Sequence, residues 1–211
     1  MHVVSNKKLS KKFRTAGMDF LLTYAEFNGK TLASKENLLK EVVSTVCLVC
    51  SEPFKETDEE GEPVQEIALW LIETLSINLK TKKIYPVLLE AATLLINSAD
   101  MNQNNTGFLV LSGMAEGCSE RLKKNLQNPV MNVLIPKGLS HQAPEVKGAA
   151  INCLTYFSEY LIPEIVEFHA TVIPSMMSYF ADLSPKVAEK ALIAVDVFFD
   201  NMEEEDIRGY L

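Results

Sequence analysis

The chain has 211 residues, of which 47% are hydrophobic and 23% charged, and its formal net charge is −8. This composition is that of a folded protein and excludes a chain that is disordered over its whole length. The acidic balance favours basic partners over nucleic acid or anionic membrane, and no apolar run reaches the ~18 residues that a membrane span needs.

The N-terminal stretch is basic, but no apolar run with a cleavage site follows it. Its basic residues are Lys7, Lys8, Lys11, Lys12 and Arg14. A secretory signal would need that apolar run. We therefore interpret these side chains as the solvated start of a helix rather than as a signal or a nucleic-acid patch.

Helical periodicity continues from this start. Residues 9–27 predict a helix, and Asn28-Gly29 predicts a left-handed cap at its end. Ser34 predicts the N-cap of a second helix that ends near Cys50.

Cysteine spacing raises the question of a metal or redox site. The cysteines are Cys47, Cys50, Cys118 and Cys153. The C-x-x-C at Cys47 and Cys50 suits zinc or redox chemistry, but it lies within an apolar helical run without a second pair or a nearby histidine. We interpret the cysteines as small buried residues in a reducing compartment and expect no metal and no other cofactor.

Residues 51–63 form a polar break whose acidic members are Glu56, Asp58, Glu59, Glu60 and Glu62. The helices expected after it are 64–79, 83–97, 105–118, 121–139, 144–160, 163–181 and 185–201. Ser184-Pro185 is a strong helix-start signal, whereas Pro136 and Pro174 predict kinks. The run Glu203 to Asp206 predicts the start of a further helix.

An internal repeat emerges from four of these helices. Ala150 lies 82 residues after Ala68, and Ala191 lies 41 residues after Ala150. Leu109 takes the corresponding position in the unit between them, and a second helix separates each pair. Two helices in about 40–47 residues is the period of HEAT and armadillo repeats, in which small residues allow close packing.

The predicted fold is all-α, a right-handed α-solenoid of about five HEAT repeats. Residues 1–50 would form HEAT hairpins in partial register, 51–63 an acidic insert loop, and 64–211 repeats of about 41 residues. Because neither end shows a polar capping repeat, we expect a longer parent solenoid.

Two stretches resemble a known family. They are residues 107–120 (GFLVLSGMAEGCSE) and 146–165 (VKGAAINCLTYFSEYLIPEI), the second followed by His169, Val172, Ile173, Pro174 and Tyr179. Both resemble repeats of the karyopherin-β (importin-β) nuclear transport receptors, and the second is most similar to the importin four branch.

The resemblance implies import of histones and ribosomal proteins. It further implies release of cargo by Ran-GTP in the full-length protein, contact with nucleoporins, and residence in cytoplasm, nucleus and, in transit, nuclear pores. Receptors of this type carry an acidic loop between the two helices of a central repeat, which matches the place of residues 51–63. Their second helices line the concave side.

Candidate cargo-binding residues are polar positions outside the apolar stripe of each second helix, together with the acidic insert. They are Glu56, Asp58, Glu59, Glu60, Glu62, Glu66, Trp70, Glu73, Asn152, Tyr156, Glu159, Asp196 and Asp200. Carboxylates can pair with Lys or Arg of a basic cargo, and a tryptophan can pack on those cations. A merely solvated face, or packing of Trp70 between repeats, is the alternative.

Two functional classes stay open at this point. One is a nuclear import receptor that binds basic protein cargo on an acidic concave face. The other is a HEAT scaffold subunit of a multiprotein complex without a transport role. An enzyme is not expected, because His2, His141 and His169 are scattered and no catalytic or phosphate-binding motif accompanies them.

Overall fold

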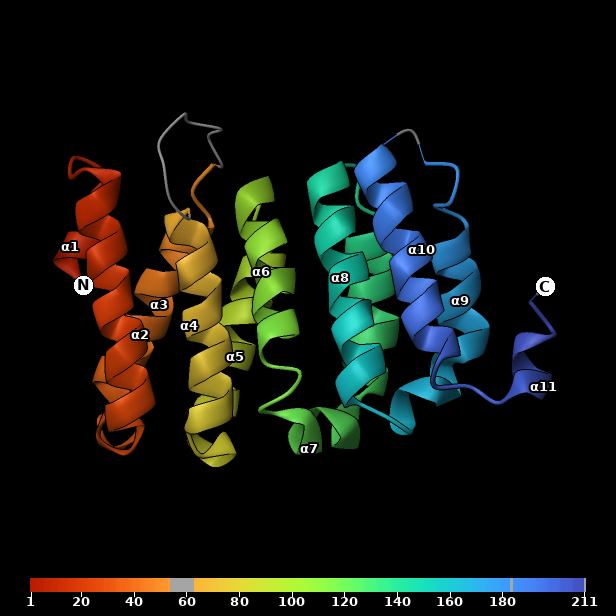
Figure 1. Cartoon of the computed structure of the whole chain (residues 1–211), viewed down its shortest axis with the longest axis horizontal. Coiled ribbons are helices and arrows are strands. Elements are labelled where there is room, and N and C mark those ends of the chain that lie inside the picture. Colours follow the sequence, from red (N-terminus) through yellow and green to blue (C-terminus); the bar gives the residue numbers. More distant parts are fainter. Residues whose placement is uncertain (54–62, 183, 211) are drawn as a thin grey trace. The chain divides into compact units, whose positions relative to one another are not determined.

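The computed structural model describes residues 1–53, 63–182 and 184–210, and within these ranges every regular element is a helix. This confirms the prediction of an all-α fold. The chain divides into two compact units, Met1–Cys118 and Ser119–Leu211, which are treated separately below (Figure 1).

The first unit consists of helical hairpins in two layers. Its helices are α1 (His2–Ser5), α2 (Lys11–Ser34), α3 (Glu36–Cys50), α4 (Val64–Asn78), α5 (Thr81–Ile96) and α6 (Met101–Gly113). Helices α3 and α4 pair, as do α5 and α6, while α2 packs along α4. One layer therefore holds α2, α4 and α6, and the other holds α3 and α5 (Figure 1). This packing differs from the predicted grouping of residues 1–50 as hairpins of their own, because the main partner of α2 is α4.

The predicted break at Asn28-Gly29 is confirmed, but the predicted left-handed cap was wrong. At Asn28, whose φ and ψ are −122° and 19°, the backbone leaves the helical conformation, so α2 (Lys11–Ser34) consists of two helices that meet at a kink. Gly29 does not have a left-handed φ; instead, a Cβ at this position would lie 3.1 Å from Leu79 Cδ1. The glycine thus serves the close approach of α2 to the end of α4 rather than a helix cap.

The predicted cap at Ser34 was also wrong. Its hydroxyl donates to the carbonyl of Thr31 at 2.7 Å, and Lys35 is the residue that precedes α3. The hydroxyl therefore closes the turn behind it instead of satisfying the amides ahead of it.

The interpretation of the cysteines as small buried residues is confirmed. Cys47, Cys50, Cys118 and Cys153 are buried, and none of them forms a disulfide. Burial raises the pKa of the Cys47 thiol to about 12 and that of Cys118 to about 11. Burial likewise raises the pKa of Cys50. Such thiols are poor nucleophiles and metal ligands at neutral pH.

The predicted repeat holds at Ala68, which is fully buried in α4, but fails in α6, where Leu109 is half-buried. The close approach in that hairpin falls at Gly107 instead. A Cβ at Gly107 would lie 2.6 Å from Ile96 Cγ1 and 2.8 Å from the Ile96 backbone nitrogen. A glycine out of the alanine register therefore makes the same packing possible.

The second unit again pairs helices. Its elements are α7 (Ser119–Leu122), η1 (Lys123–Asn125), η2 (Asn128–Leu139), α8 (Pro144–Tyr160), η3 (Glu164–Phe168), α9 (His169–Met177), α10 (Pro185–Phe199) and α11 (Glu204–Ile207). Helix η2 packs against α8, α9 packs against α10, and α8 packs along α10. Ala150 and Ala191, at the predicted small-residue positions of α8 and α10, are both fully buried.

Two predicted helices of this unit are divided into shorter elements. The expected helix 121–139 is three elements, and its last part, η2, is a π-helix that contains Pro136. This wider register suits a proline, which lacks the N–H for the regular α-helical bond and crowds the preceding turn. The expected helix 163–181 is the 3₁₀ turn η3 followed by α9, which ends at Met177; Pro174 lies inside α9, and the division falls before His169.

Two start signals of this unit are confirmed. Ser184 precedes α10 and Pro185 is its first residue. The acidic run from Glu203 leads into α11, whose first turn holds Glu204, Glu205 and Asp206.

Candidate functional site

The candidate residues of α4 lie on its free face. The predicted apolar stripe is buried throughout, namely Ile67, Ala68, Leu71, Ile72 and Leu75. Glu66 is exposed, Glu73 is half-buried, and the Trp70 side chain is 42% exposed. The indole is therefore accessible to a ligand, and the structure does not enclose it between helices as the alternative required.

A second carboxylate lies beside Glu73. It belongs to Glu116, an exposed residue of the turn that follows α6. Burial of the Glu73 side chain, followed by repulsion from Glu116, raises the pKa of Glu73. A cation between the two carboxylates would relieve this repulsion and lower the pKa again.

The turn that carries Glu116 is fixed to the end of α4. The Ser76 hydroxyl donates to the Gly113 carbonyl at 2.9 Å, and the Thr81 hydroxyl donates to the Gly117 carbonyl at 3.3 Å. A Cβ at Gly117 would lie 2.1 Å from the Ser76 carbonyl oxygen, so only glycine fits. Sequence reasoning missed Glu116, although the flanking glycines at 113 and 117 were a signal of close approach.

The second unit presents a comparable face on α8 and α10. Asn152 and Tyr156 are half-buried, whereas Glu159 is exposed, and so are Asp196 and Asp200 on the neighbouring helix. On this face the Tyr156 ring stacks on that of Tyr160, with centroids 6.2 Å apart.

A hydrogen bond joins the ends of these two helices. The Asn201 side-chain amide donates to the Ser158 carbonyl at 3.0 Å. Glu159 and Asp200 adjoin these two residues in the chain, so acidic side chains from α8 and α10 lie at the same end of the pair.

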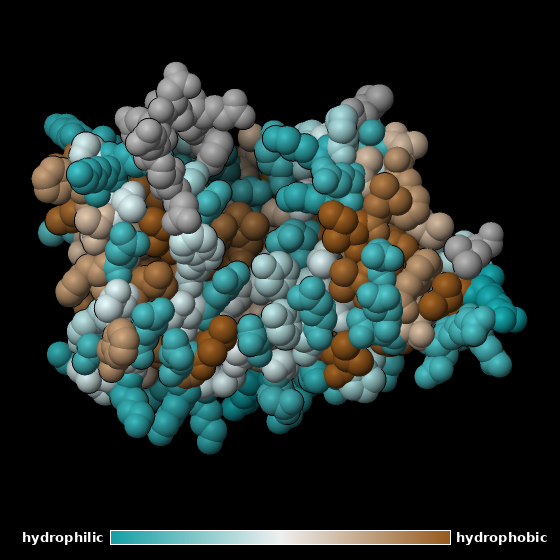
Figure 2. Space-filling view, viewed as in Figure 1, coloured by the Kyte–Doolittle hydropathy of each residue, from teal (hydrophilic) through white to brown (hydrophobic). Residues whose placement is uncertain are grey.

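The acidic side chains on these faces have no internal counter-ions. In the part of the chain that the structure describes, no ion pair involves Glu66, Glu73, Glu159, Asp196 or Asp200. Apolar side chains are exposed near them, with Ile77 at 51% on α4 and Leu192 at 52% on α10. Figure 2 shows hydrophilic and hydrophobic side chains interspersed on the faces of α4 and α10. Such faces suit ligands that combine positive charge with aliphatic stems.

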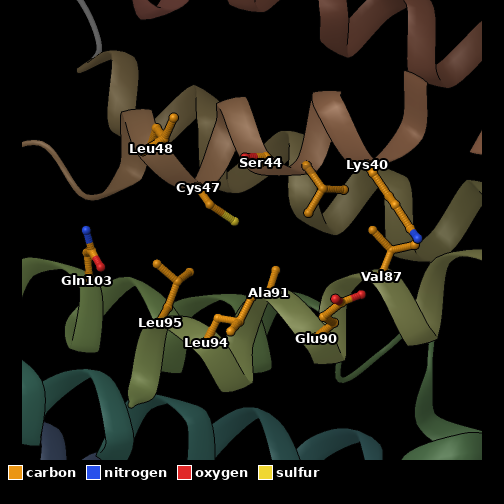
Figure 3. A pocket seen from close by; sticks show the side chains of 11 residues that line it. Lys40, Ser44, Cys47, Leu48, Val87, Glu90, Ala91, Leu94, Leu95 and Gln103 are labelled. Carbon is orange, nitrogen blue, oxygen red and sulfur yellow. The ribbon is translucent and has the colours of Figure 1, made fainter. Parts of the chain in front are cut away.

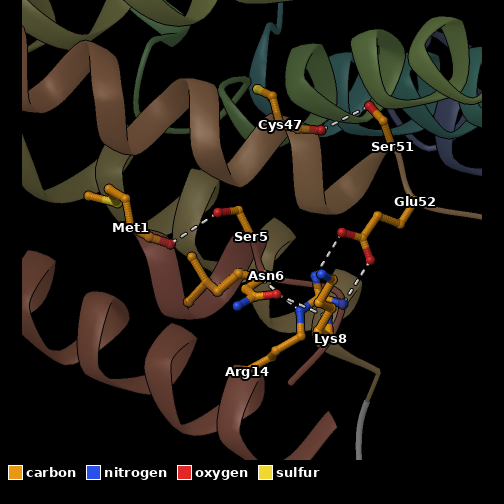
Figure 4. Close-up of polar contacts among 9 residues, drawn as sticks. Met1, Ser5, Asn6, Lys8, Arg14, Cys47, Ser51 and Glu52 are labelled. Carbon is orange, nitrogen blue, oxygen red and sulfur yellow. Dashed lines mark hydrogen bonds and ion pairs between the residues drawn. The ribbon is translucent and has the colours of Figure 1, made fainter. Parts of the chain in front are cut away.

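The remaining sequence-predicted acids are Glu56, Asp58, Glu59, Glu60 and Glu62, and all lie outside the described residues. Glu52, an acidic residue of the described part shortly before them, is held by an ion pair. Arg14 of α2 forms two hydrogen bonds of 2.7 and 2.9 Å with the Glu52 carboxylate (Figure 4).

Sequence reasoning also missed an aromatic stripe on α2. Phe13, Phe20 and Phe27 are 68%, 67% and 80% exposed. Their spacing of seven residues, visible in the sequence, places them on one face of the helix. Phe20 stacks on Tyr24 with ring centroids 6.2 Å apart.

The opposite layer of the first unit contains an apolar groove between α3 and α5, with a volume of about 290 Å³. Leu48 of α3 and Leu94 of α5 line it and are 58% and 68% exposed. Lys40 and Glu90 lie at one end and Gln103 at the other, and the Cys47 side chain points between the two helices (Figure 3).

Within the described ranges, no cluster of His, Cys, Asp or Glu could hold a metal ion. Among the same residues, no helix combines the length and apolarity needed to cross a membrane.

No protein-family profile matches the chain, but its sequence is similar to curated importins. It is 24% identical over 209 residues, 99% of the chain, to the Schizosaccharomyces pombe protein named "Probable importin subunit beta-4". It is 29% identical over 119 residues, 56% of the chain, to importin-4 of Mus musculus, and 25% identical over 195 residues, 85% of the chain, to importin-4 of Homo sapiens. The chain spans 19%, 11% and 18% of the length of these relatives.

Solved structures have the same fold. Kap121p bound to Pho4p matches 99% of the chain with a TM-score of 0.88 and 20% sequence identity, over 22% of its own length. Kap121p bound to RanGTP matches with a TM-score of 0.87, and Kap121p bound to Nup53p with 0.88. These matches confirm the predicted HEAT-repeat solenoid fold.

Proposed function

We propose that this chain forms the cargo-binding part of a nuclear import receptor, since its similarity to curated importins supports a segment of a karyopherin-β protein near the importin-4 branch. Its ligand is a basic segment of a cargo protein, of the kind found in histones and ribosomal proteins. The observation that carries this proposal is the group on α4, where Trp70 lies between two acidic residues without counter-ions.

Each residue of this group has a chemical role in the proposal. The carboxylates of Glu73 and Glu116 receive one Lys or Arg side chain, whose charge offsets their mutual repulsion. The Trp70 indole packs on the aliphatic stem or the cation of a neighbouring side chain of the cargo. Glu66, one turn earlier on α4, receives a further basic residue.

The face of α8 and α10 in the second unit offers the same chemistry. Glu159, Asp196 and Asp200 attract basic side chains, and the Asn152 amide can hydrogen-bond the extended backbone of the cargo. Tyr156 offers part of its ring surface. Exposed ion pairs contribute only ~0–1 kcal/mol each, so useful affinity requires many of them along one extended ligand.

The acidic insert belongs to the same proposal. Glu56, Asp58, Glu59, Glu60 and Glu62 would add negative charge that attracts basic cargo from a distance. These five residues lie outside the described part of the chain.

The matched structures support partners other than cargo. They include Kap121p bound to RanGTP and Kap121p bound to Nup53p. We propose that the full-length protein releases its cargo on binding Ran-GTP and contacts nucleoporins during passage between cytoplasm and nucleus. In this chain, the apolar groove between α3 and α5 suits a nucleoporin segment that inserts apolar side chains.

A HEAT scaffold without a transport role remains the alternative function. Such a scaffold would use apolar faces for permanent subunits, and the Phe13, Phe20 and Phe27 stripe is the observation that favours it. A scaffold has no need of unneutralised carboxylates around an accessible tryptophan. The two functions therefore differ in whether a basic peptide binds.

The test is titration with a lysine-rich histone-tail peptide at low and at physiological salt. Binding should weaken as salt rises, and the double variant Glu66→Gln/Glu73→Gln should bind about fivefold or more weakly. The matched control is Glu41→Gln/Glu90→Gln, which removes the same charge from the opposite layer of the unit. Equal losses in both variants, or no binding at low salt, would contradict the proposal.

A further inference from the structure

One edge of the first unit is basic although the whole chain carries a net charge of −8. Lys30 and Lys35 lie where α2 ends, and Lys80, Lys82 and Lys83 lie at the junction of α4 and α5. All of these side chains are exposed. We call this set of lysines the basic edge.

The two turns that carry the basic edge are in contact. Gly29, beside Lys30, packs against Leu79, since a Cβ added at Gly29 would lie 3.1 Å from Leu79 Cδ1. Both turns lie at the lower end of the first unit in Figure 1, where Figure 2 shows hydrophilic side chains projecting into solvent. The lysines therefore form one patch rather than two separate ones.

Nearby carboxylates neutralise only a small part of the basic edge. In the described part of the chain, no ion pair includes Lys30, Lys35, Lys80, Lys82 or Lys83. The Glu36 carboxylate, at the start of α3, is bound by Lys40 at 3.1 Å, and Lys83 contributes a weaker attraction to it. The patch consequently has a surplus of positive charge with free donors.

We propose that the basic edge binds a short, extended acidic segment of a partner protein. This function is separate from the proposed cargo binding, since it has the opposite charge and lies on the turns rather than on the free face of α4.

The chemistry of the patch favours an acidic peptide over other polyanions. Residues 30–35 and 78–83 contain no arginine, so the patch lacks the bidentate donors suited to phosphate. Phe27, exposed three residues before Lys30, is one ring rather than the row of rings on which successive bases stack. Lysine ammonium groups act as point charges that accept carboxylates in many orientations.

The size of the patch also favours a short partner. Glu26 is exposed one turn before Lys30, and Glu116 is exposed in the turn that Thr81 contacts. A duplex or an anionic membrane would extend beyond the lysines and meet these carboxylates on an acidic protein. A segment of a few Asp and Glu residues would not.

The experiment measures fluorescence anisotropy of a labelled oligoglutamate peptide titrated with the whole chain at low and at physiological salt. We expect salt-dependent binding that weakens about fivefold or more in the variant Lys80→Gln/Lys82→Gln/Lys83→Gln. The matched control, Lys7→Gln/Lys8→Gln/Lys12→Gln, removes the same charge from exposed positions near α1 and should bind as the unmodified chain does.

Both variants should fold as the unmodified chain does, because all of the altered side chains are exposed. Circular dichroism checks this. Parallel titrations use a single-stranded oligonucleotide and phosphatidylserine vesicles. The proposal is overturned if either binds more tightly than the peptide, if the control variant loses as much affinity as the test variant, or if the peptide does not bind at low salt.

Discussion

The ion pair between Arg14 and Glu52 allows a quantitative prediction of stability. Only 11% and 12% of the two side chains is exposed, and the guanidinium makes two hydrogen bonds to the carboxylate. Its third contact, from Nε to the Val4 carbonyl at 2.7 Å, links α1 to the same group. One charge therefore holds together α1, α2 and the end of α3 (Figure 4).

Removing the carboxylate alone leaves the guanidinium buried without a counter-ion. For Glu52→Ala we expect a loss of about 3–5 kcal/mol in the free energy of unfolding, the usual range for breaking a buried pair. Replacing both partners by apolar residues, as in Arg14→Met/Glu52→Leu, should cost far less, because no buried charge remains. Against a typical total stability of about 5–15 kcal/mol, the single change would be severe.

The assay is urea unfolding followed by Trp70 fluorescence, which reports on the first unit, and by circular dichroism. The control is Glu36→Ala, which removes the exposed pair with Lys40 and should leave the unfolding midpoint unchanged. If Glu52→Ala costs less than about 1 kcal/mol, or if it costs no more than the double variant, the assigned role of the buried charge is wrong.

Three further predictions concern glycines, a carboxylate and thiols. Gly117→Ala should lower the melting temperature markedly, because its Cβ would meet backbone atoms of α4 at 2.1–2.5 Å. Gly148→Ala is the control and should be neutral or stabilising, because its Cβ would lie 3.4 Å from a flexible lysine side chain. Equal melting temperatures of the two variants would refute this contrast. Because the native pKa of Glu73 is raised above 4.5, the free energy of unfolding should fall as pH rises from about 4.5 through that native pKa. Urea midpoints measured across pH should show this fall, and Glu73→Gln should flatten it. Identical pH profiles of the two proteins would show that burial of Glu73 does not affect stability. Cys47 and Cys50 should resist iodoacetamide in the native chain and react in urea, as mass spectrometry can follow; rapid native labelling would contradict their burial.

Local sequence patterns correctly predicted those features that depend on a single helix, namely its buried face and its first residue. The apolar stripe of α4 and the buried Ala68, Ala150 and Ala191 follow from periodicity, since a helix face can be read from spacing. Ser184-Pro185 marks the start of α10 because it combines two local start preferences.

Contacts between helices were beyond these patterns. Asn28-Gly29 has the composition of a cap, yet Gly29 serves the contact with Leu79 on another helix. Leu109 has the right spacing, but Gly107 makes the close approach to Ile96. These contacts depend on which other helix packs against each glycine, and the residues around the glycine in the sequence do not show this.

The candidate surface shows the same division. Glu66 and Trp70 were predicted from the free face of one helix, and both are exposed. The approach of Glu116 to Glu73 joins two helix ends through Gly113 and Gly117, so only the folded chain reveals it.

Basic cargo binding at α4 can be tested most directly through Trp70, the single tryptophan of the chain. Its partly exposed indole should change its emission when an unlabelled lysine-rich peptide binds. We predict a saturable, salt-sensitive change in emission that Glu73→Gln weakens. Peptide binding by calorimetry without any change in Trp70 emission, or no binding at low salt, would contradict the account.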